Sequence, residues 1–219
     1  MKVFDNITLK CDVEELTTFC HLNYIKDKID NFEAIIEEGY GLLDPKAMYT
    51  VAEITEVKGD QLILRDGHVF ESNLLAEKFK CNSEIAVYIV TIGSTLERHV
   101  TELGPKDLSR SFIIDCIGTY ALNQIHEIIS KDFRPRGGDR ISKFSPGATA
   151  YWDLRQQKVL FDILGSENVE KITGVRLNEY YIMIPKKTVS GVIGDTEEQF
   201  HECQICKRRC EYRRAPFKG

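Results

Sequence analysis

The stretch from Lys143 to Gly147, KFSPG, and the stretch from Met183 to Gly191, MIPKKTVSG, decide the fold of this chain. In the first, Pro146 and Gly147 predict a sharp turn, because proline fixes its φ angle and glycine reaches conformations that strain other residues. Such a turn lets a ligand approach bare backbone, and Lys143 adds a point charge for a carboxylate. The second stretch predicts a strand, a turn and a strand. Taken singly, each is also compatible with an ordinary turn or hairpin.

The sequence around these stretches predicts a mixture of helices and antiparallel strands. Apolar positions three and four residues apart, with capping signals, predict helices over 13–24, 26–43, 95–103, 107–130 and 151–164. Alternation and turn signals predict strands over 49–56, 61–65, 85–92, 175–184 and 188–193. Because helices and strands do not alternate regularly, we expect an α+β fold, with an antiparallel sheet and flanking helices.

Residues 132–150 show no clear period. Long loops inside compact domains are uncommon and are usually functional or mobile. This segment is basic: it carries Arg134, Arg136, Arg140 and Lys143 against Asp132 and Asp139. We therefore expect it to lie beside a ligand site.

Composition describes an ordinary globular protein of 219 residues, 42% hydrophobic, with 29 basic and 34 acidic side chains. A net charge of −5 argues against a general nucleic-acid-coating role. The sequence contains no apolar run near the ~18 residues that would indicate a membrane span, and its start has no secretion signal. Four single cysteines fit small buried side chains in a reducing compartment: Cys11, Cys20, Cys81 and Cys116. We expect a cytoplasmic protein without membrane or nucleic-acid partners.

The C-terminal segment differs from the rest of the chain. Residues 203–219 carry six basic residues and one acid, whereas the remainder carries 23 basic and 33 acidic residues. We therefore expect one domain over 1–200 and a Cys-rich basic tail over 201–219. The tail contains His201, Cys203, Cys206 and Cys210, a spacing compatible with a zinc site or an iron–sulfur cluster. A basic tail with free thiols is the alternative.

Common catalytic motifs are missing from the sequence. It contains no G-x-G-x-x-G after a strand, no phosphate-binding G-x-x-x-x-G-K-[ST], no H-E-x-x-H and no G-x-S-x-G. The five histidines are dispersed, and His126 fits a core or surface histidine better than a ligand. The sequence therefore does not indicate a self-contained hydrolase or dehydrogenase.

Together and in this order, the two stretches resemble the activation domain of cobalamin-dependent methionine synthase, particularly its free-standing forms. The family pattern places an apolar helix with Gln-x-x-x-Phe after the Pro-Gly turn, and Gln157 and Phe161 keep that spacing. The second stretch matches the family's M-x-P-x-x-S-V-S-G, with Thr188 for the first serine. Thr91-Ile-Gly and Asp115-x-Ile-Gly are also similar. The resemblance spans roughly residues 45–200.

The resemblance implies a module that binds S-adenosylmethionine (AdoMet) and supports reductive remethylation of cobalamin, without a catalytic residue of its own. The corrinoid is expected on a partner methyltransferase or corrinoid protein, with an electron donor, because Glu71 stands where the cobalamin motif D-x-H-x-x-G needs glycine. The implied AdoMet-binding residues are Lys143, Ser145, Pro146, Gly147, Ala148, Tyr151, Ser190 and Gly191.

Three positions depart from the family pattern. Lys143 stands for an arginine that holds the AdoMet carboxylate, Ala148 for a tyrosine after Pro-Gly, and Asn123 for a helix glutamate. Tyr151 or Trp152 would supply the missing aromatic after a one-residue insertion. Two alternatives remain open at this point: a non-catalytic docking adaptor for a corrinoid protein, or a metal protein acting through its tail.

Overall fold

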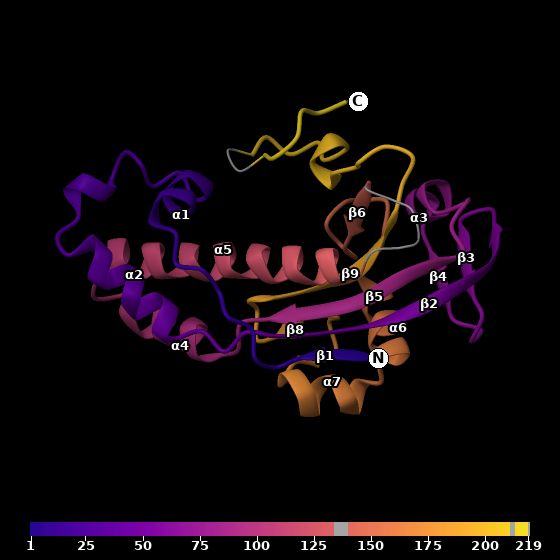
Figure 1. The fold of residues 1–219 in the computed structure, drawn as a ribbon, viewed down its shortest axis with the longest axis horizontal. Coiled ribbons are helices and arrows are strands. Elements are labelled where there is room, and N and C mark those ends of the chain that lie inside the picture. The colour runs from indigo at the N-terminus through magenta and orange to yellow at the C-terminus, as the bar shows by residue number, and fades with distance from the viewer. Residues whose placement is uncertain (134–139, 211–212, 219) are drawn as a thin grey trace.

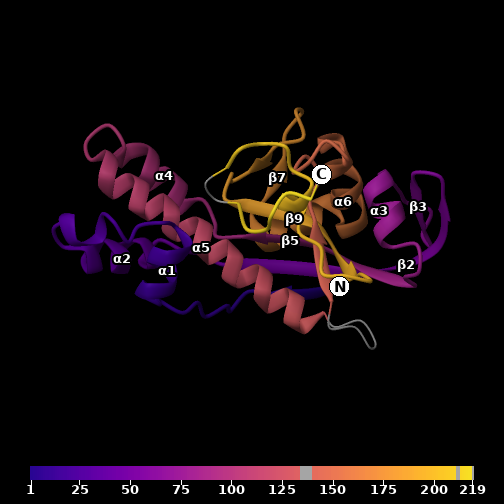
Figure 2. The same ribbon diagram turned by 90° about the horizontal axis from the view of Figure 1, so that it is seen from above.

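A computed structural model describes residues 1–133, 140–210 and 213–218. Its described part contains an antiparallel sheet with helices on both faces (Figures 1 and 2). The strands are β1 (Lys2–Phe4), β2 (Lys46–Lys58), β3 (Gln61–Leu64), β4 (Val69–Glu71), β5 (Glu84–Thr91), β6 (Ile141–Phe144) and β9 (Thr188–Asp195), and β7 (Arg176–Leu177) and β8 (Met183–Ile184) form a separate pair.

The main sheet is antiparallel at each described pairing, with strand order β4-β3-β2-β5-β9-β6 and β1 beside β2. Central strand β5 is buried along almost its whole length, which explains its continuous apolar sequence, EIAVYIVT. Strand β9 lies between β5 and β6. The segment that ends in Gly191 is therefore placed beside the segment that leads into the Pro-Gly turn.

One face of the sheet carries the long helix α5 (Leu108–Asp132). Three further helices pack against α5: α1 (Val13–Phe19), α2 (Phe32–Gly41) and α4 (Thr95–Leu103). The start of α5 is fixed by Asp107, whose carboxylate accepts a hydrogen bond from the Arg110 backbone N–H at 2.9 Å. Ile113, Ile117 and Ile125 bury its apolar side against Tyr88 and Ile193 of the sheet.

The other face carries α3 (Asn73–Lys78), α6 (Gln157–Leu164) and α7 (Ser166–Thr173), with the short 3₁₀ turn η2 (Leu154–Gln156) leading into α6. Figure 1 shows α5 and α7 on opposite sides of the sheet. The C-terminal tail, with the 3₁₀ turn η3 (Glu202–Gln204), lies on the same side as α5 (Figure 1). A further 3₁₀ turn, η1 (Lys26–Lys28), follows α1.

The α+β prediction is confirmed, but several boundaries were wrong. The helix predicted over 151–164 begins only at Gln157, because Asp153 caps the 3₁₀ turn before it. The strand predicted over 175–184 is two short strands of a hairpin. The segment 132–150 is not wholly irregular, since it contains β6. Arg134, Arg136 and Asp139 of the predicted basic loop lie outside the described residues.

Candidate functional site

The register of β5, β9 and β6 sorts the side chains between the two faces of the sheet. Tyr88 pairs with Gly191, and Lys143 pairs with Ile193. Directly opposed residues of an antiparallel pair share a face, as do residues two apart on one strand. Since Tyr88 and Ile193 belong to the core beneath α5, Gly191 and Lys143 lie on the α5 face as well.

Gly191 allows β6 to approach β9 closely at the end of the sheet. A Cβ atom on Gly191 would lie 2.0 Å from the carbonyl oxygen of Phe144 and 3.1 Å from the hydroxyl of Ser145. Any side chain there would push β6 away from β9. The missing side chain thus leaves room on the α5 face into which Ser145 extends.

The predicted turn at Pro146 and Gly147 is present. Gly147 has a φ of 78°, its N–H donates to the Trp152 carbonyl at 2.8 Å, and the Ala148 N–H donates to the Ser145 carbonyl at 3.2 Å. The turn therefore uses the N–H groups of Gly147 and Ala148 internally. The N–H of Ser145, just before the turn, donates to the tail instead.

Tyr88 contributes a fully buried polar atom near this turn. Its side chain is 0% exposed, yet its hydroxyl has no hydrogen bond of normal geometry among the described residues. Burial raises the pKa of the hydroxyl, a weak side-chain contact with the Ser145 hydroxyl lowers it, and the negative charge of Glu202 raises it. A buried hydroxyl without a partner is uncommon in a folded protein and indicates a missing ligand atom or water.

Lys143 places a positive charge beside α5. Burial lowers the pKa of its ammonium group, Glu127 of α5 raises it, and Arg214 of the tail lowers it. Among the described residues, no acidic oxygen lies within 4.0 Å of the ammonium. Burial and Lys143 together lower the pKa of His126 to about 3, so its imidazole is neutral at physiological pH. Lys143 is therefore available for an anionic group.

A cavity of about 640 Å³ lies between α5 and α1. Glu127, which acts on Lys143, lines it together with Arg214. The Asn123 amide, at the position where the family pattern has glutamate, donates to Glu127 at 3.2 Å. The remaining lining is mostly polar and acidic: Glu14, Glu15, Thr18, Phe19, Tyr120, Asn123 and Gln124. The cavity thus has an acidic wall, and neither Lys143 nor Tyr88 lines it.

The tail covers the turn. A carboxylate oxygen of Glu202 accepts the Ser145 backbone N–H at 3.2 Å. Burial raises the pKa of Glu202 to about 7, and the Ser145 N–H opposes this shift. The ring of Phe200, two residues earlier, stacks on Phe144 with centroids 5.4 Å apart. The tail therefore packs directly against the end of β6.

The structure brings together only part of the predicted AdoMet site. Lys143, Ser145 and Gly191 share the α5 face, next to Pro146 and Gly147. Ser190 lies on the opposite face and donates its hydroxyl to the Gln157 amide oxygen at 2.5 Å. Ala148 is exposed at the turn.

The two aromatic candidates after the turn lie elsewhere. Tyr151 is 46% exposed, and its carbonyl accepts a hydrogen bond from the Ser72 hydroxyl at the start of α3. Trp152 is 1% exposed and packs edge-on against Phe70 in the core of the opposite face. The suggestion that Trp152 supplies a ligand-facing aromatic was therefore wrong, because its ring is needed to fill that core.

The predicted metal ligands do not form a site. Among residues 1–133, 140–210 and 213–218, no group of three or more His, Cys, Asp or Glu side chains could hold a metal ion. His201 instead accepts the Cys203 N–H at its Nδ1, and the Arg213 guanidinium donates to the carbonyls of Cys203 and Cys206. These hydrogen bonds explain the local fold of the tail, so the structure does not support the metal prediction.

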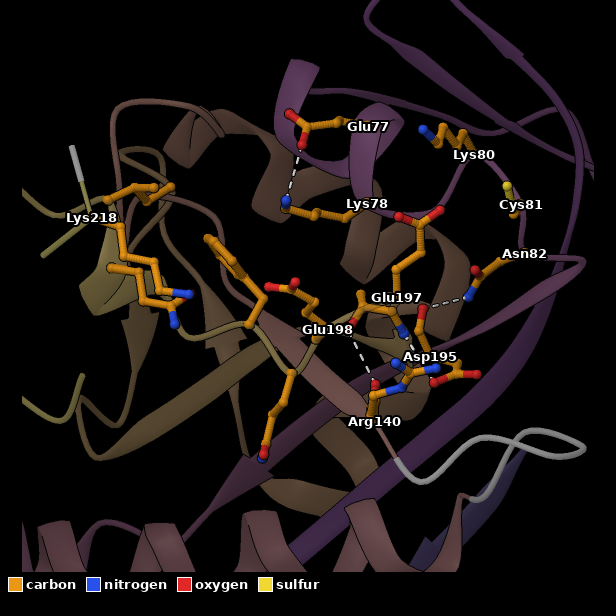
Figure 3. A pocket seen from close by; sticks show the side chains of 15 residues that line it. Glu77, Lys78, Lys80, Cys81, Asn82, Arg140, Asp195, Glu197, Glu198 and Lys218 are labelled. Carbon is orange, nitrogen blue, oxygen red and sulfur yellow. Dashed lines mark hydrogen bonds and ion pairs between the residues drawn. The ribbon is translucent and has the colours of Figure 1, made fainter. Parts of the chain in front are cut away.

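A second cavity, of about 470 Å³, lies between α3, the ends of β6 and β9, and the tail (Figure 3). Lys78 pairs with Glu77 at its edge, and the Asn82 amide donates to the Asp195 backbone carbonyl. Arg140, Lys80 and Lys218 face Glu197 and Glu198 around it (Figure 3). It lies apart from Lys143 and Tyr88, neither of which lines it.

The fold of this chain is similar to that of a solved structure. That structure is described as the MetH reactivation domain bound to AdoHcy: the TM-score is 0.62 at 15% identity, covering 88% of this chain and 72% of that chain. The resemblance found in the sequence is thus confirmed at the level of the fold.

The sequence comparisons add nothing to this likeness. No protein-family model matches the chain, and no curated protein matches it. Within the described residues, no helix is both long and apolar enough to cross a bilayer.

Sequence reasoning missed Tyr88, His126 and Glu202 as neighbours of the turn. Tyr88 gives a weak signal, since its hydroxyl interrupts an otherwise apolar central strand, EIAVYIVT. His126 was assigned to the core or surface, and only the packing of α5 on β6 shows that Lys143 acts on it. Glu202 gives no signal in the sequence, because it approaches Ser145 only through the fold of the tail.

Proposed function

We propose that this chain binds AdoMet at the β6 turn, on the α5 face of the sheet, and that it supports the reductive remethylation of cobalamin carried by a partner. The observation that carries the proposal is the buried hydroxyl of Tyr88 beside Ser145, which has no hydrogen bond of ordinary geometry among the described residues. It lies on the same face as Lys143, whose ammonium has no acidic oxygen of the described residues within 4.0 Å. These groups lie at the end of a sheet whose fold is that of a domain described as bound to AdoHcy.

The charged side chains around the proposed site fit the charges of AdoMet. The ligand carries a carboxylate, an ammonium group and a sulfonium. Lys143 provides a cation for the carboxylate, although as a point charge it lacks the two parallel donors of an arginine. The acidic side chains of Glu14, Glu15 and Glu127 along the cavity favour the positive groups. The Tyr88 hydroxyl is available to a polar ligand atom.

The chain's contribution to methyl transfer is to bind and orient the sulfonium. When a partner presents reduced cobalamin, its cobalt supplies the nucleophile that takes the methyl group, and AdoHcy is the other product. The electron that first reduces the cobalt comes from an external donor. Holding the methyl group in line with the cobalt and excluding water are positioning effects. No general base is needed for this transfer.

Titration calorimetry with AdoMet and AdoHcy tests the binding step. We expect saturable heats for the wild-type protein and an affinity about fivefold lower for Tyr88→Phe, since one hydrogen bond contributes about 1 kcal/mol. Tyr180→Phe is the matched control, because Tyr180 is 70% exposed. The free energy of unfolding of Tyr88→Phe should stay unchanged or rise, since the variant removes an unpaired buried hydroxyl. Absence of heat with the wild-type protein at millimolar ligand contradicts the proposal.

The methyl-transfer step is tested with a purified corrinoid methyltransferase that lacks its own reactivation domain. Anaerobic mixing with AdoMet and titanium(III) citrate should convert the visible spectrum of its oxidised cobalamin to that of the methylated form. Omission of this chain should slow the conversion strongly. If AdoMet binds but the spectrum does not change in the presence of the chain, the role is binding without reactivation of that partner.

A further inference from the structure

Two cysteine side chains lie side by side between α1 and α5. The Sγ of Cys20, the residue that ends α1, donates to the Cys116 backbone carbonyl of α5 at 3.4 Å. The two thiols also hydrogen-bond each other, and both side chains are buried. The expectation of four buried single cysteines was therefore wrong for Cys11 and Cys81, which are exposed. The fold instead pairs two thiols that are 96 residues apart in sequence.

The surroundings of this pair make one thiol more acidic than the other. The pKa of Cys20 is lowered, first by its hydrogen bond with the Cys116 thiol. The positive charges of Arg214 and Lys187 lower this pKa further, while burial and the negative charge of Asp115 oppose the shift. The same hydrogen bond raises the pKa of Cys116, and burial adds to the rise. Because the thiolate is the nucleophilic form, Cys20 is suited to attack and Cys116 to follow.

The pair lies next to the cavity between α1 and α5. Phe19, directly before Cys20, lines this cavity, and so does Tyr120, one helical turn after Cys116. Arg214 lines it as well, with its guanidinium 3.6 Å from the centre of the Phe19 ring. Neither cysteine lines the cavity itself, in agreement with their burial. An oxidant that comes close to the pair must therefore be small.

The two helices are already held together beside the pair. The Tyr120 hydroxyl of α5 donates to the Glu15 carboxylate of α1 at 2.6 Å, and the Tyr120 ring packs edge-on against Phe19 with centroids 5.2 Å apart. Both views of the fold show α1 beside α5 (Figures 1 and 2). A bond between the two sulfur atoms would therefore join elements that are already packed, rather than draw distant ones together.

We propose that Cys20 and Cys116 are a reversible dithiol–disulfide pair, which hydrogen peroxide oxidises and whose disulfide locks α1 onto α5. The Cys20 thiolate attacks a peroxide oxygen: an S–O bond forms, the O–O bond breaks, and hydroxide leaves and takes up the proton that Cys20 lost. The Cys116 sulfur then attacks the Cys20 sulfur: the S–S bond forms, the S–O bond breaks, and the departing hydroxide leaves as water with the Cys116 proton. Two thiols and hydrogen peroxide thus give a disulfide and two molecules of water. This inference does not depend on the proposed function.

Peptide mapping by mass spectrometry tests the pair in the unmodified full chain. After mild peroxide treatment, blocking of free thiols in denaturant and trypsin digestion without reductant, residues 11–26 should be linked to residues 111–131. Dithiothreitol should release the two peptides. Fragmentation assigns the bond to Cys20 or to Cys11, which lie on the same peptide. Cys11→Ser is the matched control and should form the link as the wild type does, because Cys11 is exposed and outside the pair.

Thermal unfolding measures what the cross-link does to the fold. Peroxide should raise the Tm of the wild type by about 5 °C or more, because the disulfide closes a long loop and restricts the unfolded chain. Dithiothreitol should reverse this rise after the peroxide is removed. Cys20→Ser and Cys116→Ser should show no rise, while Cys81→Ser should keep it. Backbone amides of α1 should exchange hydrogen more slowly in the oxidised wild type.

Three results would overturn the inference. The first is that Cys20 and Cys116 remain thiols at a peroxide dose that oxidises the exposed Cys81. The second is that Cys20 proceeds to sulfinic acid without a link to Cys116. The third is a linked peptide with no change in Tm or in the exchange of α1, which contradicts the locking of α1. Each of these results leaves AdoMet binding at the β6 turn untouched.

Discussion

The hydroxyl of Ser190 donates to the side-chain oxygen of Gln157 at 2.5 Å, and this buried hydrogen bond joins the MIPKKTVSG stretch to the helix with Gln157 and Phe161 that follows the Pro-Gly turn. It connects β9 to the first turn of α6 beneath the sheet, on the face opposite Lys143. This hydrogen bond fixes β9 on the face opposite Lys143. The α5 face of β9, which carries Gly191, remains available to the Pro-Gly turn.

Replacing Ser190 with alanine should therefore lower stability more than ligand affinity. Gln157 is 4% exposed, so the variant leaves its amide oxygen buried without this donor, at a cost of about 1–3 kcal/mol. Urea unfolding measures the loss, with Ser109→Ala on the exposed side of α5 as the control. A tenfold loss of AdoMet affinity without loss of stability would instead assign Ser190 to the ligand.

Lys143→Ala should weaken AdoMet binding about tenfold or more, because a charge-assisted hydrogen bond contributes about 1.5–3 kcal/mol. Lys143→Arg should retain or improve affinity, since a guanidinium offers two parallel donors to a carboxylate. Calorimetry with AdoMet measures both. Lys158→Ala is the control and should bind like the wild type, because the Lys158 side chain lies on the exposed side of α6. Equal affinity of Lys143→Ala and wild type would place the ligand carboxylate elsewhere.

Gly191→Ala should separate β6 from β9, because the added Cβ would lie 2.0 Å from the Phe144 carbonyl oxygen. We expect a loss of at least about 1–3 kcal/mol in unfolding free energy, and loss of AdoMet binding with it. Gly41→Ala is the control: nothing lies within 4 Å of the methyl group that this change adds at the end of α2, so stability should hold or rise slightly. A Gly191→Ala protein of normal stability would contradict the close approach.

The pKa of Glu202, raised to about 7 from an ordinary 4.5, makes the fold depend on pH. The folded state holds this proton more tightly than the unfolded state, so the stabilisation is full below pH 4.5 and is lost as pH rises through about 7. The pKa of His126 is lowered to about 3, so its stabilising contribution to the fold is instead lost as pH falls below 6.5.

Comparison with Glu202→Gln separates the two effects, because His126 is common to both proteins. Relative to this variant, the wild type should lose roughly 2–3 kcal/mol of unfolding free energy between pH 4.5 and pH 8. Urea unfolding across that range supplies the measurement. A difference that stays constant with pH would show that Glu202 titrates normally and is not buried against Ser145.

The fold was largely predictable from local patterns. The α5 helix was found because its apolar positions recur at helical spacing, and β9 because MIPKKTVSG matches a known strand-turn-strand pattern. The short elements β6, α3 and α7 were missed. Each has eight residues or fewer, too few for a period to be distinctive, and each is held in place by packing against the sheet.

The candidate site was predicted only in part, for a similar reason. Lys143, Ser145 and the Pro-Gly turn are adjacent in sequence and form a recognisable motif. Tyr88 comes to the same place from β5, and Glu202 comes from the tail. Their positions follow only from the strand register and from the fold of the tail. The thiols of the tail suggested metal, whereas Arg213, which binds backbone carbonyls there, carries no motif.

The most direct test of the central claim is a crystal structure of the full chain with AdoHcy. The account predicts ligand density at the β6 turn on the α5 face of the sheet, with its carboxylate at Lys143 and a polar atom at the Tyr88 hydroxyl. Density in a cavity apart from these residues, such as the one bordered by Lys78 and Arg140, or no ligand density at saturating AdoHcy, would contradict it.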